Sequence, residues 1–499
     1  MSNLVEDLVF ACILYAVVLL VIGAFARQAR QADTLDDYFL AGRSLGISVL
    51  LFTLFATQFS GNSFSGFPGQ VYREGLAYFM GATFTVGIVT GYLLFAPRLR
   101  RLATRHRFLT PTDFLWHRFG SPAISYIASV IFILTLCNFL LSQLIALGQA
   151  FSGISDGAVP YWAVVVAGGI TVLVYQVVGG MRAVAWTDVL QGVLVMLGIL
   201  LFIVMLGVEV GTPGTVVRSV QLLRPELAAP PTLELCLVWL SNLLLLALGA
   251  PLYPQAVQRV YAARKTTALR NVLAILAVLA LVIGTTVVFI GAAGIALFPE
   301  LEGVTSDQVT FRVVAYLVES SSFGYYPALM LMVAIIAAIM STADSCLLSV
   351  SSVFTKDIFA RLQGTAEVEA NRLTRRPIII SAVVMLVLIL IAMRPVTTLW
   401  GLLVVKFEIL IQLSPAFVLG TLHERGEARA FSVNDILAGL ITGLGGTLVL
   451  YLLGITSVYG LNAGTVGVAF NYLVVLAGWW RRQRRGTAAT ADAERALAA

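Results

Sequence analysis

The chain has 499 residues, of which 59% are apolar and only 12% are charged. Soluble domains contain about 25% charged residues, so this sequence cannot cover a water-facing surface and is expected to lie in lipid. The net charge of +6 does not indicate a nucleic-acid-binding protein, because the basic residues lie in short tracts between apolar runs, such as Arg98 to Arg107. An enzyme is not indicated either, since no nucleophile is accompanied by a base.

Thirteen stretches are long and apolar enough for transmembrane helices, each of which needs about 20 residues. In chain order they are residues 4–26, 45–72, 76–97, 123–150, 159–178, 184–208, 232–253, 268–298, 324–353, 376–394, 398–421, 433–454 and 463–480. The first has no basic residue before it and no small-residue cleavage site after it, so we interpret it as a retained span rather than a signal peptide.

The loop charges predict the orientation of these spans. If the N-terminus is periplasmic, the predicted cytoplasmic segments contain 26 of the 32 Lys and Arg residues, the predicted periplasmic segments contain five, and Lys406 lies within a span. Basic residues concentrate on the cytoplasmic side of membrane proteins. The sequence therefore predicts an inner-membrane protein with a periplasmic N-terminus and a cytoplasmic C-terminus.

Glycine and proline interrupt the second and seventh stretches. The second contains two Ser-Gly steps and a Phe-Pro-Gly between Leu54 and Gly69, and the seventh reads Leu-Gly-Ala-Pro-Leu-Tyr-Pro from Leu248 to Pro254. Such interruptions free backbone carbonyls, which are costly in hydrocarbon unless they line a cavity or bind an ion. The interruptions are five spans apart, and this odd number predicts two inverted repeats with a substrate site at the breaks. The alternative is that Gly and Pro are simply common in membrane helices.

This pattern predicts an all-α membrane protein of about 13 transmembrane helices, with a five-plus-five inverted-repeat core and broken helices 2 and 7. The regions are an N-terminal extra helix with the first cytoplasmic loop (1–44), repeat 1 (45–208), repeat 2 (209–422), two C-terminal extra helices (423–480) and a basic, alanine-rich cytoplasmic tail (481–499).

The ninth stretch carries candidate cation ligands. Ala338, Ser341 and Thr342 are spaced i, i+3, i+4 and therefore share one helix face. Two hydroxyls and a freed carbonyl are hard oxygen ligands that suit a weakly bound alkali cation. The alternative is that each hydroxyl only bonds the carbonyl of its own preceding turn.

Ionisable residues within the stretches need partners, because charge inside a membrane is costly. Asp344 is either a ligand of a second oxygen site with Ser345 or a lining of an aqueous exit path. Asp188, at the start of the sixth stretch, is either a second candidate or a helix N-terminal carboxylate stabilised by the dipole. Lys406 and Glu408 either neutralise each other or face the cavity.

These residues together resemble a known family, the sodium:solute symporters, over roughly residues 5–480. The motifs that carry the resemblance, in chain order, are Asp36 to Gly46, Ala56 to Gly61, Gly179 to Gln191, Gln258-Arg259 and Ala338 to Ser345. The resemblance implies the five-plus-five fold and Na⁺ as the coupling ion.

The resemblance also implies ligands for sodium. For the core site these are the backbone carbonyls of Ala56, Phe59 and Ala338 and the hydroxyls of Ser341 and Thr342. A second cation site near the cytoplasmic side would be formed by Ser341, Asp344, Ser345 and Asp188, whose two carboxylates either tighten the site or carry a proton.

The sequence departs from the family pattern in its substrate region. Gln58 stands where the proline carriers have an aspartate, and the seventh stretch lacks the Asn-Gln-Tyr run of the sugar carriers. These departures argue against proline and galactose-like sugars and favour a more apolar pocket. The polar candidates for substrate binding are Gln58, Asn62 and Gln143, with helix packing as the alternative role of Gln143.

The sequence therefore predicts a sodium-coupled secondary active symporter that imports a small organic solute, such as an organic carboxylate, an amino acid or a vitamin-like molecule, by alternating access. Its partners are the solute, sodium and the lipid bilayer, not nucleic acid, and the oligomeric state stays open. The alternatives are a transporter-like membrane sensor with a separate signalling partner, a channel and a proton-coupled carrier.

Overall fold

The computed structural model describes residues 2–29, 34–320, 325–361, 375–395, 397–423, 427 and 431–498. Helices dominate this part of the chain, and the one small sheet pairs β1 (Ser457–Val458) with β2 (Leu461–Asn462). The helices of the first half are α1 (Ser2–Gln28), α2 (Leu35–Leu40), α3 (Ile47–Gln58), α4 (Phe67–Glu74), α5 (Phe84–His106), α6 (Pro111–Phe119), α7 (Pro122–Ser155), α8 (Tyr161–Glu209) and α9 (Pro213–Leu223). Those of the second half are α10 (Leu233–Gly249), α11 (Pro254–Ala262), α12 (Thr266–Leu297), α13 (Val309–Ser320), α14 (Tyr325–Ser352), α16 (Arg376–Ala392), α17 (Leu399–Leu410), α18 (Ser414–Val418), α19 (Val433–Leu452) and α20 (Ala463–Ala498).

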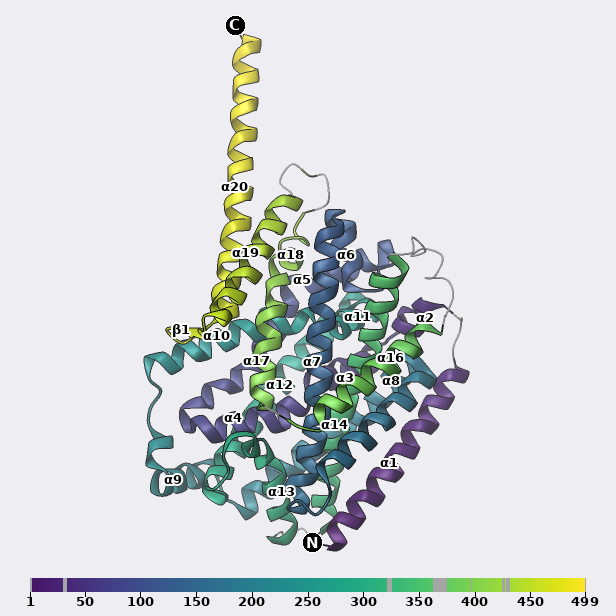
Figure 1. Cartoon of the computed structure of the whole chain (residues 1–499), viewed down its shortest axis with the longest axis vertical. Helices are drawn as coiled ribbons and strands as arrows, with labels where there is room; N and C mark the ends of the chain where they lie inside the picture. The colour runs from purple at the N-terminus through teal and green to yellow at the C-terminus, as the bar shows by residue number, and fades with distance from the viewer. Residues whose placement is uncertain are drawn as a thin grey trace.

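The prediction of an all-helical membrane protein is confirmed. Within the described residues, ten helices are long and apolar enough to cross a membrane, or eleven if the bent pair α3 and α4 counts as one span. Two shorter apolar helices, Tyr161–Val177 and Arg376–Ala392, lie where the sequence predicted two further spans. The two termini lie at opposite ends of the molecule, and α20 extends well beyond the bundle (Figure 1).

The second predicted span is interrupted, but over fewer residues than its glycines and proline suggest. Helix α3 ends at Gln58, the axis turns by 51°, and a π-helix from Asn62 to Gly66 leads into α4. Pro68 does not break the chain, because it lies in the first turn of α4, where its missing N–H has no helical partner to lose. The interruption is therefore confined to the three residues between Gln58 and Asn62.

The seventh predicted span is also interrupted. A short 3₁₀ turn, Ala250–Leu252, follows α10, and Tyr253 then leaves the helical region with φ −51° and ψ 132° before α11 begins at Pro254. A further kink divides α8 at Gly180, whose φ of 60° favours glycine. A Cβ atom there would lie 2.6 Å from the Tyr38 ring, so the position also needs glycine for space.

Helix α14 forms the centre of the bundle. In its membrane-spanning window 94% of the residues are buried within the protein, whereas only 22% are in that of α1. Helix α14 packs against α7 and α8, and α1 covers the outer side of α8 (Figure 1). The polar residues of α14 therefore face other helices rather than lipid, and they need partners within the protein.

Candidate functional site

The break after α3 leaves the Ala56 backbone carbonyl without its helical donor. In a continuous helix the Ala56 carbonyl would accept from the N–H of Ser60, but that N–H donates to the Ser63 hydroxyl at 3.2 Å. The Ala56 oxygen instead accepts from the hydroxyls of Ser341 at 3.3 Å and Thr342 at 3.2 Å. The interruption in α3 is thus joined directly to the middle of α14.

The same two hydroxyls lie close to a second carbonyl. Ser341 and Thr342 also approach the Ala338 oxygen, at 3.0 and 3.2 Å. Each hydroxyl therefore lies within bonding distance of a carbonyl of its own helix and also of the Ala56 carbonyl, so the alternative interpretation and the cluster are both present. Phe59, the fifth predicted ligand, is buried where the chain leaves α3, but none of the contacts described for this cluster involves its carbonyl. Ala56, Ala338, Ser341 and Thr342 bring four uncharged oxygens together in the protein interior.

Two of the four residues predicted for a second cation site bond an arginine. The Arg259 guanidinium, from α11, donates through Nη2 to an oxygen of Asp188 at 2.9 Å and to the Ser345 hydroxyl at 2.6 Å. Its Nε donates to the Thr53 hydroxyl at 2.7 Å, and Thr53 in turn bonds Asp188. All these side chains are fully buried, so Arg259 supplies a positive charge between α3, α8 and α14.

Asp344 belongs to the same network but does not contact the arginine. Its carboxylate accepts from the Tyr175 hydroxyl at 2.8 Å and from the Ser345 hydroxyl at 3.1 Å. The Ser345 hydroxyl also lies 2.8 Å from the Ser341 carbonyl, so this network begins one helical turn from the oxygen cluster. The dipole interpretation of Asp188 does not describe its surroundings, because Asp188 lies inside α8 and is paired with Arg259.

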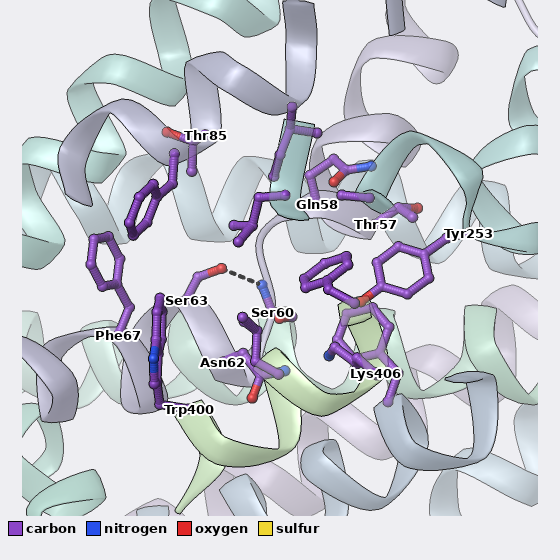
Figure 2. A pocket seen from close by; sticks show the side chains of 17 residues that line it. Thr57, Gln58, Ser60, Asn62, Ser63, Phe67, Thr85, Tyr253, Trp400 and Lys406 are labelled. Atoms are coloured by element: carbon purple, nitrogen blue, oxygen red, sulfur yellow. Dashed lines mark hydrogen bonds between the residues drawn. The ribbon is translucent and has the colours of Figure 1, made fainter. Parts of the chain in front are cut away.

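A cavity of about 50 Å³ lies at the break. It is lined by residues of α3, the break itself, the π-helix, α4, α5, α7, α10, the segment after α10, and α17. Phe67 and Trp400 lie at one end of the cavity, and Tyr253 and Lys406 lie at the other (Figure 2). Of the remaining lining residues, seven are apolar and six have neutral polar side chains. The prediction of an apolar pocket beside the breaks agrees with this lining.

The three predicted substrate-binding residues have different positions. Gln58 and Asn62 line the cavity; Gln58 donates to the Tyr92 hydroxyl at 2.5 Å, and Asn62 donates to Ser142 at 3.2 Å. Gln143 lies outside the lining, and its side-chain oxygen accepts the Gly61 N–H at 2.8 Å. Gln143 therefore satisfies a backbone donor that the break exposes, which is the packing role left open above.

Lys406 and Glu408 do not neutralise each other. Glu408 accepts the Gly464 N–H at 3.1 Å and bonds the Tyr451 hydroxyl, on the side of α19 and α20. Lys406 is 1% exposed and lines the cavity, with its ammonium 3.5 Å from the centre of the Phe139 ring. The second alternative therefore holds for Lys406: it faces the cavity.

A contact region around Asp307 joins α4 to α17 beyond the aromatic end of the cavity. Asp307 accepts the Leu399 N–H at 2.7 Å, at the start of α17, and lies 3.5 Å from the Arg73 guanidinium at the end of α4. Burial raises the pKa of Asp307 to about 6, and the Leu399 and Arg73 contacts offset only part of that rise. Close packing here requires glycine, since a Cβ atom at Gly69 would lie 2.7 Å from the Asp307 carboxylate.

Comparison with known proteins identifies the family. A profile of the sodium:solute symporter family matches residues 38–443. The chain belongs to the sodium:solute symporter family. Members of this family are multi-pass membrane transporters rather than enzymes, and they couple the movement of a small solute to that of sodium.

Two relatives indicate how far this sodium:solute symporter resembles characterised proteins. It is 26% identical to the sodium/pantothenate symporter of Escherichia coli (strain K12) over 463 residues, which cover 90% of this chain and 92% of the relative. It is also 26% identical to the sodium/proline symporter of Staphylococcus aureus (strain JH9) over 439 residues, covering 86% and 83% of the two chains. At this level of identity the substrate does not transfer.

Two solved structures share the fold. One is a Na⁺-coupled sialic acid symporter in a substrate-bound outward-open state, described as revealing a novel Na⁺ site; its TM-score is 0.72 at 18% identity, covering 95% of this chain and 97% of that one. The other is a nucleobase-cation-symport-1 family transporter in a closed conformation with bromovinylhydantoin bound, with a TM-score of 0.58 at 17% identity, covering 91% and 95%.

Sequence reasoning used Arg259 only as part of a motif and missed its place in the network. The available signal was a charged residue shortly after a broken span, in a chain with two intramembrane aspartates to neutralise. Trp400 was also missed, because one aromatic residue in an apolar stretch carries no signal of its own.

Proposed function

We propose that this protein is a sodium-coupled secondary active symporter that imports a small organic solute by alternating access. The observation that carries the proposal is the Ala56 carbonyl facing the hydroxyls of Ser341 and Thr342 across the break in α3. Sodium prefers hard oxygen ligands, and an ion among these oxygens would tie α3 to α14. An ion that stabilises the joined arrangement makes solute binding depend on sodium, and the coupling is reciprocal.

The ion ligands in this proposal are the backbone oxygens of Ala56, Phe59 and Ala338 and the hydroxyls of Ser341 and Thr342. Each hydroxyl keeps a lone pair for the ion while donating its proton to a carbonyl. The solute contacts are Gln58 and Asn62 in the neighbouring cavity, and Gln143 positions the break rather than touching solute. This division follows from the lining of the cavity and the bond from Gly61 to Gln143.

We further propose that one sodium ion is carried in each cycle. The alternative second site of Asp188, Ser341, Asp344 and Ser345 is supported only in part, because the Arg259 guanidinium already donates to two of its members. An arginine is always charged, so it supplies the positive charge that a second sodium ion would bring.

The proposed topology has thirteen spans in two inverted repeats, with a periplasmic N-terminus and a cytoplasmic C-terminus. It is supported by the eleven spans that include the bent pair and by the two shorter apolar helices. It is also supported by the breaks, one of which lies in the first span of each proposed repeat. The proposed boundaries are residues 45–208 and 209–422. The 26 basic residues in the proposed cytoplasmic segments support the orientation.

The experiment that tests this function is uptake into proteoliposomes containing the purified full-length protein. A panel of radiolabelled carboxylates, amino acids and vitamins is offered under an inward sodium gradient and under a matching potassium gradient. We expect at least one solute to accumulate only with sodium, and saturable counterflow separates a carrier from a channel. No sodium-dependent accumulation of any solute would overturn the proposal.

Matched variants locate the effect. Ser341→Ala with Thr342→Ala is expected to abolish sodium-stimulated uptake. The control is Ser129→Ala with Thr135→Ala, which removes two buried hydroxyls of α7 that bond only carbonyls of their own helix, at 2.8 to 3.1 Å. The control is expected to retain uptake, because its hydroxyls contact neither the break nor the cavity.

A further inference from the structure

The ammonium of Lys406 is buried at one end of the cavity without a hydrogen-bond acceptor among the described residues. Its surroundings are three aromatic rings, whose centres lie 3.5 Å (Phe139), 5.6 Å (Phe407) and 5.7 Å (Tyr253) from the nitrogen. The carboxylate nearest to it in sequence, Glu408, is engaged by Gly464 and Tyr451. In its protonated form, Lys406 is thus a donor with no oxygen acceptor among the described residues.

Such an arrangement is costly for a lysine unless a ligand completes it. A charged side chain within the membrane needs a partner, and breaking a buried ion pair leaves an uncompensated charge that is strongly destabilising. The faces of the aromatic rings attract the ammonium, but they accept no proton. The missing partner is an anion that enters the cavity.

The rest of the cavity defines the body of that anion. No acidic side chain lies among the described lining residues, and the polar groups other than Lys406 are neutral hydroxyls and amides. The buried side-chain oxygen of Asn62 also has no partner in the described structure. At the end opposite Lys406, the Phe67 and Trp400 rings stack with centroids 5.7 Å apart and offer an apolar surface (Figure 2).

From this lining we infer that the solute is a small monocarboxylate with an apolar body, and that Lys406 binds its carboxylate. The inference rests on the proposed function, since it takes the solute to bind in this cavity. An amino acid fits less well, because its ammonium group would find no carboxylate there. The volume of about 50 Å³ corresponds to roughly three or four water positions, which favours a short chain.

The test uses butyrate as the probe, with butyramide as its uncharged analogue and 2-aminobutyrate as its zwitterionic analogue. The melting temperature of the purified full-length protein is measured with each compound at saturating sodium, and butyrate affinity is obtained from its concentration dependence. We expect butyrate to raise the melting temperature and both analogues to have little effect. The inference would be overturned if butyrate and butyramide stabilised the protein equally, or if none of the three compounds stabilised it.

Two variants then locate the contact. Lys406→Met removes the charge while keeping most of the side-chain volume and is expected to raise the dissociation constant of butyrate by about 30-fold or more, the effect of losing one partner of a buried charge pair. Lys406→Arg keeps the charge and is expected to retain part of the affinity. Lys265→Met makes the same chemical change at an exposed lysine and is expected to bind butyrate normally.

The readouts separate this inference from the proposed function. Lys406→Met is expected to keep the stabilisation by sodium alone, because Lys406 is not a proposed ion ligand. If sodium does not raise the melting temperature of the unmodified protein, the proposed function itself is contradicted. Normal butyrate affinity in Lys406→Met would refute only the role of Lys406. If Lys406→Met does not fold, the three probes on the unmodified protein still decide the class of solute.

Discussion

The carbonyl oxygen of Ala56 lies 3.2 Å from the hydroxyl of Thr342, although the two residues are 286 positions apart in the chain. The contact joins the end of α3, where the helix is interrupted, to the most buried helix of the bundle. An ion bound here would hold together the end of α3, which lines the cavity, and the centre of α14. In the proposed function, this contact is where sodium binding is coupled to transport.

Arg259→Met is predicted to create a second sodium dependence. Without the guanidinium, Asp188 loses its only cationic partner among the described residues, and the uncompensated charge is expected to cost about 3 to 5 kcal/mol. Sodium can enter between Asp188, Ser345 and Asp344, so the melting temperature of the variant should depend on sodium more steeply than that of the unmodified protein. A variant that is destabilised equally at low and high sodium would contradict this account.

Gly69→Ala is predicted to block transport without removing the ion site. The added Cβ atom would lie 2.7 Å from the Asp307 carboxylate and 3.0 Å from the Ser306 carbonyl, so α4 could not pack against this loop without a shift. We expect uptake to fall about tenfold or more, because overpacking costs about 1 to 3 kcal/mol. Stabilisation by sodium should persist, because Gly69 is not a proposed ion ligand. Gly446→Ala is the control, since a Cβ atom there has open space around it. Normal uptake by Gly69→Ala would show that this contact is not needed.

Asp307 is predicted to make stability depend on pH. Burial raises its pKa from 3.8 to about 6, so the folded protein holds the proton more tightly than the unfolded chain does. The contribution of Asp307 is therefore fully present below about pH 4 and is lost as the pH rises through 6, by up to about 3 kcal/mol.

Asp307→Asn tests this prediction, because other titrating groups cancel when the two proteins are compared. The stability of the unmodified protein minus that of the variant should fall between pH 4 and pH 7 in thermal melts. A difference that is constant or rises over this range would contradict the assignment.

Transport of the proposed solute is predicted to be insensitive to membrane voltage. One sodium ion and one monocarboxylate carry no net charge together, and the Arg259 charge does not leave the protein. Uptake of radiolabelled butyrate into proteoliposomes should be the same with and without an imposed inside-negative potential, at a fixed sodium gradient. A several-fold rise in uptake with the potential would indicate that a second cation accompanies each solute.

Much of the fold follows from the sequence because membrane helices need long apolar stretches. The ten long apolar helices, the bent pair and the two shorter apolar helices each overlap one of the thirteen stretches, and the breaks near Gly61 and Tyr253 lie where glycine and proline cluster. The shorter helices α2, α6, α9, α11 and α13 lie between the stretches and were not predicted. The spacing of Ser341 and Thr342 was enough to place both on one face of α14. The π-helix from Asn62 to Gly66 had no sequence signal, and the close approach of Gly66 to Leu399 of α17 is a tertiary contact that local sequence does not encode.

The partners of buried charges were harder to predict. Asp188 and Arg259 are 71 positions apart, and nothing in either local sequence states that they meet. The separation of Lys406 from Glu408 was predictable, because residues two positions apart point about 200° apart around a helix. The helical period could not predict which of the two side chains would face the cavity.

The most direct measurement of the central claim is equilibrium binding of radioactive sodium to the purified full-length protein. The account predicts saturable binding at one site per chain, lost in Ser341→Ala with Thr342→Ala and retained in the control Ser129→Ala with Thr135→Ala. If a folded Ser341→Ala, Thr342→Ala protein bound sodium as well as the unmodified protein, the account would be contradicted. The bound ion would then not need the two hydroxyls that join α3 to α14.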